Sequence, residues 1–147
     1  MPKSKPVFRL VLQIVCIPLI ILTAILLSAA SESKSLDAFD ASMKWLDLVD
    51  NGKYQESYNQ SSAYFRSVVL KQDWVQMIEA VREPLGKVIS RDFKSSQHTN
   101  SLPGAPDGEY VVIQFDTSFA NKKTAVETIT PMEDDDGQWR VSGYYIK

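Results

Sequence analysis

The sequence predicts an α+β fold in which N-terminal helices pack on a curved four-stranded antiparallel sheet. Apolar residues recur at helical spacing between residues 38 and 85, and a period of two prevails from residue 88 onward. The helices precede the strands instead of alternating with them, which favours antiparallel pairing. A sheet with one apolar face must be covered, so we expect the helices to cover it.

The first thirty residues differ in composition from the rest and are predicted to direct export. A short flank with three positive charges precedes an uncharged apolar run over residues 10–27, and Ser28, Ala29 and Ala30 supply the small residues that a signal peptidase reads. The run is also about as long as the ~18 residues that span a membrane, so a retained anchor remains the alternative. Pro18 within the run and the small residues that follow it favour cleavage.

Both alternatives place residues 31–147 outside the cytoplasm, because the positive flank stays on the cytoplasmic side. We therefore expect a periplasmic or secreted domain that touches the membrane only through residues 10–27 if the segment is uncleaved. Cys16, the only cysteine, lies inside the apolar run and eleven residues before its end, so no lipoprotein signal is predicted. Residues 1–30 are the signal or anchor, and residues 31–147 are one domain large enough to fold without disulfides.

Residues 31–147 hold thirteen Lys and Arg against eighteen Asp and Glu, a net charge of −5. This balance and the expected compartment argue against nucleic-acid binding. The acidic run over residues 133–136 lacks the alternating ligands and closing glutamate of a calcium loop. We interpret it as a solvated hairpin tip and predict neither a metal site nor a cofactor.

Helical periodicity predicts four segments ahead of the sheet. The first has a broad apolar face and ends near Gly52; the face is made by Ala38, Phe39, Ala41, Met43, Trp45, Leu46, Leu48 and Val49. Two short segments follow, marked by Tyr54, Ser57, Tyr58 and Ser61, and then by Phe65, Val68 and Val69. A longer helix carries Trp74, Ile78, Val81 and Leu85, and Pro84 with Gly86 should terminate it.

The strongest strand pattern runs from Gly108 to Phe119. Its alternation gives a dry face with Glu109, Val111, Ile113, Phe115 and Phe119, and an outer face with Tyr110, Gln114, Asp116 and Ser118. A weaker strand precedes it over residues 88–97.

Two further strands follow over residues 124–132 and 138–146, and Asp136-Gly137 predicts a tight hairpin between them. On the last strand, Trp139 and Val141 should share one side, with Arg140, Ser142 and Tyr144 on the other.

Three segments resemble the bacterial family called domain of unknown function 4019. They are Trp45 to Tyr54, Ser101 to Asp116 and Asp136 to Tyr144, and the resemblance covers nearly all of residues 31–147. It implies export but carries no assigned activity. The order of elements resembles the nuclear transport factor 2-like, or cystatin-like, roll, in which sheet and helices enclose a cone-shaped cavity.

Few residues suggest chemistry. His98 is the only histidine and lies in a polar segment, so an exposed loop residue is favoured over a catalytic one. Asp116 is the acid to consider first, although the alternation points it outward. Trp45, Tyr58, Trp74, Phe115 and Trp139, together with Tyr54 and Tyr145, form either a cavity lining or simply a core, and the core is favoured.

Two function classes therefore remain. The favoured one is a non-enzymatic module of the cell envelope that binds a small apolar ligand or another envelope protein. The alternative is a small hydrolase, isomerase or dehydratase that uses a buried Asp or His as general acid or base. An enzyme needs at least two titratable groups converging in the cavity, whereas a binding module can fill its interior with its own side chains.

Overall fold

The computed structural model describes residues 32–147, of which Ser35–Lys147 form one compact unit. The predicted export segment and its cleavage point lie outside the described residues. Within residues 32–147, every helix is too short or too polar to cross a membrane.

The compact unit has helices first and strands second, as predicted. The N-terminal helix continues to residue 50, and three more helices follow: α2 (Tyr54–Asn59), α3 (Ala63–Val68) and α4 (Lys71–Leu85). The strands are β1 (Val88–Thr99), β2 (Tyr110–Phe119), β3 (Lys122–Glu133) and β4 (Trp139–Ile146). Each pairs antiparallel with the next, in the order β1-β2-β3-β4. The α+β class and the four antiparallel strands are confirmed.

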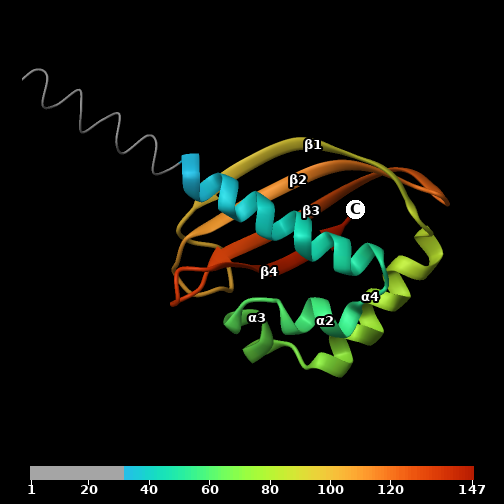
Figure 1. Cartoon of the computed structure of the whole chain (residues 1–147). Coiled ribbons are helices and arrows are strands. Elements are labelled where there is room, and N and C mark those ends of the chain that lie inside the picture. Colours follow the sequence, from blue (N-terminus) through green and yellow to red (C-terminus); the bar gives the residue numbers. More distant parts are fainter. Residues whose placement is uncertain (1–31) are drawn as a thin grey trace, which may run out of the picture. The chain divides into compact units, whose positions relative to one another are not determined.

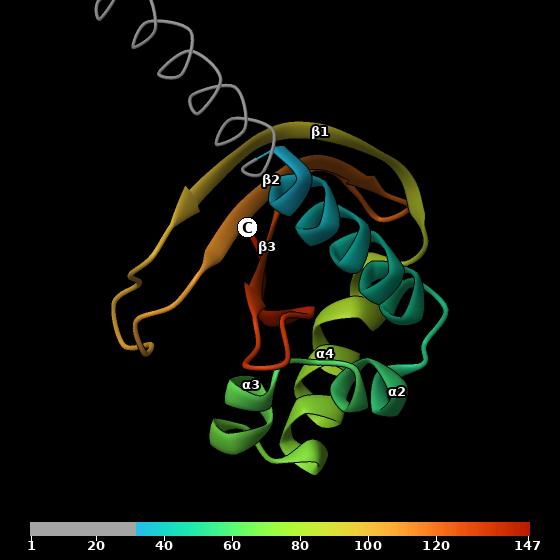
Figure 2. The same ribbon diagram turned by 60° about the vertical axis from the view of Figure 1, so that its left-hand side comes forward.

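The sheet is strongly curved, and the N-terminal helix lies along its concave side (Figure 1). A view turned by 60° shows β1 and β2 arching over this helix, while α2, α3 and α4 gather on its other side (Figure 2). The helix is thus enclosed by sheet and helices, which explains why so much of its surface is apolar.

The core is built between this helix, the short helices and the inner face of the sheet. Trp45 and Trp74 contact each other with ring centroids 5.5 Å apart, and Phe65 meets Trp74 edge to face at 5.3 Å. Phe115, Trp139 and Val141 belong to the same buried cluster. The prediction that Phe115 and Trp139 face one core with Trp45 and Trp74 is confirmed.

Buried serines satisfy two of the indole donors in this core. Trp45 Nε1 donates to the Ser57 carbonyl at 2.8 Å and to Ser61 Oγ at 3.1 Å. Trp74 Nε1 donates to Ser57 Oγ at 3.1 Å. Because a buried donor without an acceptor is costly, these serines are what allow two tryptophans to be buried together.

Two predictions about α4 are wrong. Val81 is 42% exposed, and Arg82 takes its place on the buried stripe with Trp74 and Ile78. The buried positions are four residues apart, so the stripe passes through Arg82. Pro84 lies inside the last turn instead of ending the helix, and Gly86 ends it with a φ of 75°.

The face assignment of β2 needs two corrections. Glu109, expected on the dry face, has 36% of its side chain exposed. Asp116 is exposed and Val111, Ile113 and Phe115 are buried, as predicted. Tyr110, expected on the outer face, is fully buried, and its hydroxyl donates to the Pro106 carbonyl at 2.7 Å. The loop before β2 therefore covers the outer side of the sheet at this point.

The face assignment of Tyr144 is also wrong. A register shift between Thr130 and Pro131 in the β3–β4 pairing places Ile129 opposite Tyr144 and Pro131 opposite Val141. The extra residue on β4 is a β-bulge, which inverts the alternation beyond it. Tyr144 therefore points inward, where its ring lies 5.3 Å from that of Trp45.

The hairpin between β3 and β4 has a longer loop than predicted. Gly137 does have a positive φ of 75°, but β3 ends at Glu133 and β4 begins at Trp139, so five residues connect the strands. The tip is also less solvated than expected, because the Asp134 side chain is only 9% exposed. Its carboxylate accepts from the Ala63 backbone N–H at the start of α3, with both oxygens at 3.2 Å.

Candidate functional site

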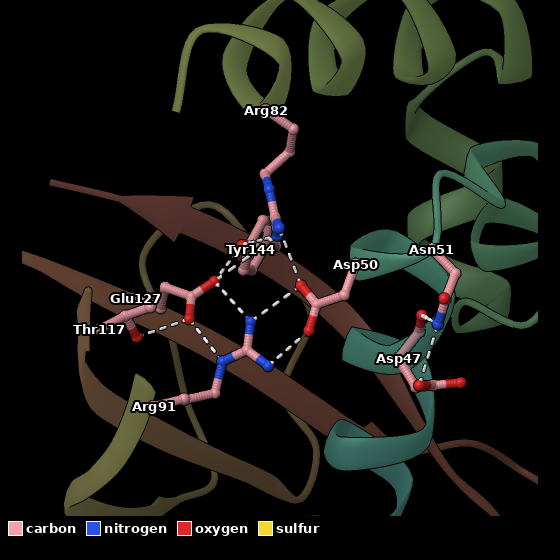
Figure 3. A network of polar contacts seen from close by, with 8 residues as sticks. All are labelled: Asp47, Asp50, Asn51, Arg82, Arg91, Thr117, Glu127 and Tyr144. Carbon is pink, nitrogen blue, oxygen red and sulfur yellow. Dashed lines mark hydrogen bonds and ion pairs between the residues drawn. The ribbon is translucent and has the colours of Figure 1, made fainter. Parts of the chain in front are cut away.

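The most distinctive feature of the interior is a polar network that joins all the major elements. It contains two arginines, two carboxylates and two hydroxyls, which we call the interior network: Asp50, Arg82, Arg91, Thr117, Glu127 and Tyr144 (Figure 3). The N-terminal helix, α4 and all four strands each contribute one side chain. The two positive and two negative charges balance.

Glu127 is the centre of the interior network and is fully buried. Its Oε2 accepts from Arg91 Nε and from Thr117 Oγ1, each at 2.6 Å. Its Oε1 accepts from Arg91 Nη2 at 3.2 Å and from the Tyr144 hydroxyl. A carboxylate has about four lone-pair sites, so Glu127 has no acceptor capacity left for another molecule.

Asp50 is the second carboxylate and lies nearer the surface, with 24% of its side chain exposed. Arg91 binds it in a bidentate manner, Nη1 to Oδ2 at 2.7 Å and Nη2 to Oδ1 at 3.0 Å. Arg82 Nη2 reaches Oδ1 at 2.9 Å. The guanidinium groups of Arg91 on β1 and Arg82 on α4 thus fix the last residue of the N-terminal helix against both the sheet and α4.

Arg82 is the least satisfied member. Its Nη1 donates to the Tyr144 hydroxyl at 3.3 Å, and its guanidinium lies 5.0 Å from the Phe119 ring centroid. Its Nε is the one fully buried side-chain nitrogen or oxygen without a partner in residues 32–147. The cation–π contact with Phe119 partly offsets this loss.

The electrostatics favour fixed protonation states. Burial raises the pKa of the Tyr144 hydroxyl well above its ordinary value of 10, and the adjacent Glu127 charge raises it further. Burial acts to lower the pKa of Arg91, but hydrogen bonds to Asp50 and Glu127 outweigh it and raise that pKa. Tyr144 therefore stays a donor and Arg91 stays a cation, which suits a structural bridge better than a proton relay.

Sequence reasoning missed this network, although two of its members left a signal. Glu127 alternates with Ala125 and Ile129, so a carboxylate lies on the apolar face of β3. Arg82 continues the four-residue spacing of Trp74 and Ile78. A charge at a core position implies a buried partner, but the identity of that partner depends on the fold.

The two residues first considered for chemistry lie apart from the interior network. His98 is exposed, as predicted, but it lies in β1 and not in a loop. Its Nε2 contacts Glu109 Oε2 at 2.7 Å, and the two side chains are 41% and 36% exposed. Asp116 is 59% exposed and pairs with Lys94 Nζ at 2.8 Å on the outer face of the sheet. The structure does not bring these two residues together.

The aromatic side chains considered as a cavity lining are packed in the core. All five (Trp45, Tyr58, Trp74, Phe115 and Trp139) are 9% exposed or less, whereas Tyr145 is 61% exposed. They pack on one another, and Tyr58 also donates its hydroxyl hydrogen bond to the Val69 carbonyl at 2.8 Å. These five residues thus belong to the buried core, and Trp45 and Trp139 also border the cleft described next.

A cleft opens at the edge of this core, and we call it the Trp139 cleft. It has a volume of about 540 Å³ and lies between the N-terminal helix, the end of α2 and the hairpin before β4. Trp45 and Trp139 border it, and its other walls carry mostly polar side chains, among them Asp37, Asp40 and Lys44. It does not include any member of the interior network.

The fold and these two features define a small α+β domain with a packed aromatic core, a closed interior network and a polar cleft beside two tryptophans. Residues 41–144 match the family model described as protein of unknown function (DUF4019), and the chain belongs to this family. The predicted family resemblance is thereby confirmed. Searches of the curated proteins and of the solved structures found no match.

Proposed function

We propose that this protein is a non-enzymatic binding module of the cell envelope, exported by its N-terminal segment and built on a nuclear transport factor 2-like roll. The curved sheet around a central helix supports the roll, and the order of charged flank, apolar run and small residues supports export. The binding site in this proposal is the Trp139 cleft.

One observation carries the choice of binding over catalysis. Titratable groups do converge in the interior, but the acceptor sites of Glu127 are filled by Arg91, Thr117 and Tyr144. A general base needs a free lone pair within reach of the substrate proton. The carboxylate acceptors of the interior network are all used by its own members, whereas the Trp139 cleft is open to solvent.

Nuclear magnetic resonance of the full chain with a library of small neutral and charged compounds tests this proposal. We expect the perturbed amides of any saturable binder to cluster at residues 37–45, 59–60 and 137–141, with the compound recovered unchanged. Perturbations centred on Asp50 and Glu127, together with conversion of the compound, would favour the cavity-based enzyme instead.

Export is tested separately on the cell. We expect mass spectrometry of the mature protein to find an N-terminus at Ser31, as cleavage after Ala30 requires, and a reporter fused at Lys147 to be active only outside the cytoplasm. An intact N-terminus in the membrane fraction would indicate the retained anchor. A reporter active only in the cytoplasm would refute export.

A further inference from the structure

Trp139 differs from the other two tryptophans in its hydrogen bonding. The indole N–H groups of Trp45 and Trp74 donate to serine oxygens. Trp139 is 9% exposed, yet its Nε1 has no acceptor anywhere in residues 32–147. Arg82 Nε is the one fully buried unpartnered atom in this part of the chain, so the Trp139 N–H must reach solvent.

Trp139 borders the cleft, which is open to solvent. A largely buried ring that presents one unpaired donor at a cleft is a common way to orient a ligand, because the ring gives apolar contact and the N–H gives direction. The cleft volume of about 540 Å³ lies within the roughly 300 to 1,000 Å³ usual for small-molecule sites.

Three other side chains of the cleft also lack a hydrogen-bond partner within residues 32–147. Asp37, Asp40 and Gln138 line the cleft, and none has a side-chain partner among the described residues. Together with Trp139 they offer carboxylate acceptors, an amide that both donates and accepts, and an indole donor. A ligand that satisfies all of them must itself carry several groups that donate and accept.

The charges argue against an anionic ligand. Arg140 borders the cleft, but Nη1 is occupied by Asp134 at 2.8 Å and Nη2 by Asp136 at 2.8 Å. Among the described residues, the unpaired charges of the cleft are then the two negative carboxylates of Asp37 and Asp40 and the one positive charge of Lys44. A phosphate or carboxylate would meet a net negative wall.

We infer that the Trp139 cleft binds a short neutral saccharide, with the Trp139 N–H donating to a ligand oxygen and Asp37, Asp40 and Gln138 contacting its hydroxyls. This inference rests on the proposed binding function and names its ligand class. Hydroxyl groups donate and accept at the same atom, which is what this mixed set of free groups requires. The apolar ligand expected from the sequence is replaced here by a polar one, because the free groups of the cleft are polar.

Calorimetry with the purified full chain and an uncharged N-acetylglucosamine trisaccharide tests the inference. We expect saturable binding that Gln138→Ala and Trp139→Phe each weaken about three- to tenfold, the cost of one hydrogen bond. Trp139→Phe keeps an aromatic ring and removes the N–H. Gln72→Ala is the matched control, because Gln72 is an exposed glutamine of a different cleft, beside α4, and should leave the affinity unchanged.

The outcomes separate this inference from the proposed function. Absence of saturable trisaccharide binding, or equal weakening by Gln72→Ala, overturns the saccharide assignment. If a charged peptide binds instead and Gln138→Ala weakens that binding, the ligand class is wrong while the binding module stands. New reducing ends released from the trisaccharide would overturn the binding module itself.

Discussion

Two arginine–carboxylate networks in this protein have similar geometry and opposite surroundings. In the interior network, Arg91 binds Asp50 and Glu127 at 2.6 to 3.2 Å, and its side chain is 10% exposed. In the hairpin before β4, Arg140 binds Asp134 and Asp136 at 2.8 Å, with 29% of its side chain exposed and 57% of that of Asp136. Judged by bond lengths alone, the two networks would be expected to contribute equally to stability.

The two networks differ in whether water can replace a partner that is removed. An exposed group regains water, and for this reason surface ion pairs typically contribute only about 0 to 1 kcal/mol. A buried group cannot regain water, so loss of one partner leaves an uncompensated charge that costs about 3 to 5 kcal/mol. Burial, more than bond geometry, therefore sets the free-energy cost of breaking each network.

The interior network also has a different role in the fold. It links the end of the N-terminal helix to α4 and to β1, β3 and β4, segments that are far apart in the sequence. The hairpin network mainly orders a five-residue loop and the start of α3. Removing the first should therefore loosen the whole domain, and removing the second only its edge.

The largest expected effect is that of Glu127→Gln. The amide has the same shape but leaves Arg82 and Arg91 with Asp50 as their only carboxylate, so we expect the free energy of unfolding to fall by about 3 to 5 kcal/mol. Urea denaturation of the full chain measures it. Asp136→Asn is the control for the same chemical change at the surface. Equal effects of the two substitutions would refute the comparison.

Tyr144→Phe should have the next largest effect. It removes only the hydroxyl that donates to Glu127 and accepts from Arg82, so the core keeps its packing. Hydrogen bonds to charged groups contribute about 1.5 to 3 kcal/mol, and we expect a loss of that order. Thermal unfolding measures it, with Tyr145→Phe on the exposed neighbour as the control. A loss no greater than that of the control would mean that the hydroxyl adds nothing to the network.

The hairpin network predicts a pH effect at acidic pH. The hydrogen bond from Arg140 lowers the pKa of the Asp136 carboxyl from its ordinary 3.8 to about 2. Since the folded pKa is the lower one, the stabilisation is fully present above 3.8 and is lost as the pH falls through about 2. A carbon-detected titration should find this midpoint, and in Arg140→Ala the midpoint should return toward 3.8. An unchanged midpoint in that variant would assign the lowered pKa to another cause.

Asp116→Asn should have the smallest effect. Its ion pair with Lys94 is exposed on both sides, at 59% and 43%, so we expect a change within about 0.5 kcal/mol. Chemical denaturation at low and high salt checks it, since screening should remove what little difference there is. A loss of several kcal/mol, or a strong pH dependence, would indicate that Asp116 acts on the interior despite its exposure.

The sequence predicted the elements well where local chemistry decides them. The four strands and their antiparallel order follow from period-two runs and turn residues, and Gly52, Gly86 and Gly137 do adopt positive φ at helix and hairpin ends. The shared core of Trp45, Trp74, Phe115 and Trp139 followed from the same periodicity. These features depend on neighbours within a few residues, which is the range that a sequence pattern reports.

Errors arose where tertiary contacts override the local period. The bulge near Thr130 turned Tyr144 inward, and the loop through Pro106 buried Tyr110. The stripe of α4 passes through Arg82 because the Asp50 carboxylate and the Phe119 ring contact its guanidinium there, which no spacing within α4 reveals. A buried charge looks like an ordinary surface charge until its partners are known.

The family, the α+β class, the order of strands and most of the apolar core could thus be predicted from the sequence alone, because periodicity and turn chemistry act locally. The folded arrangement was needed to show that Asp50, Arg82, Arg91 and Glu127 meet, that their network is closed, and that Trp139 keeps an unpaired donor and borders a cleft. The physical reason is that these properties depend on contacts between segments far apart in the sequence, such as Arg82 and Tyr144, which are separated by 62 residues, and on which polar groups remain unpaired after packing.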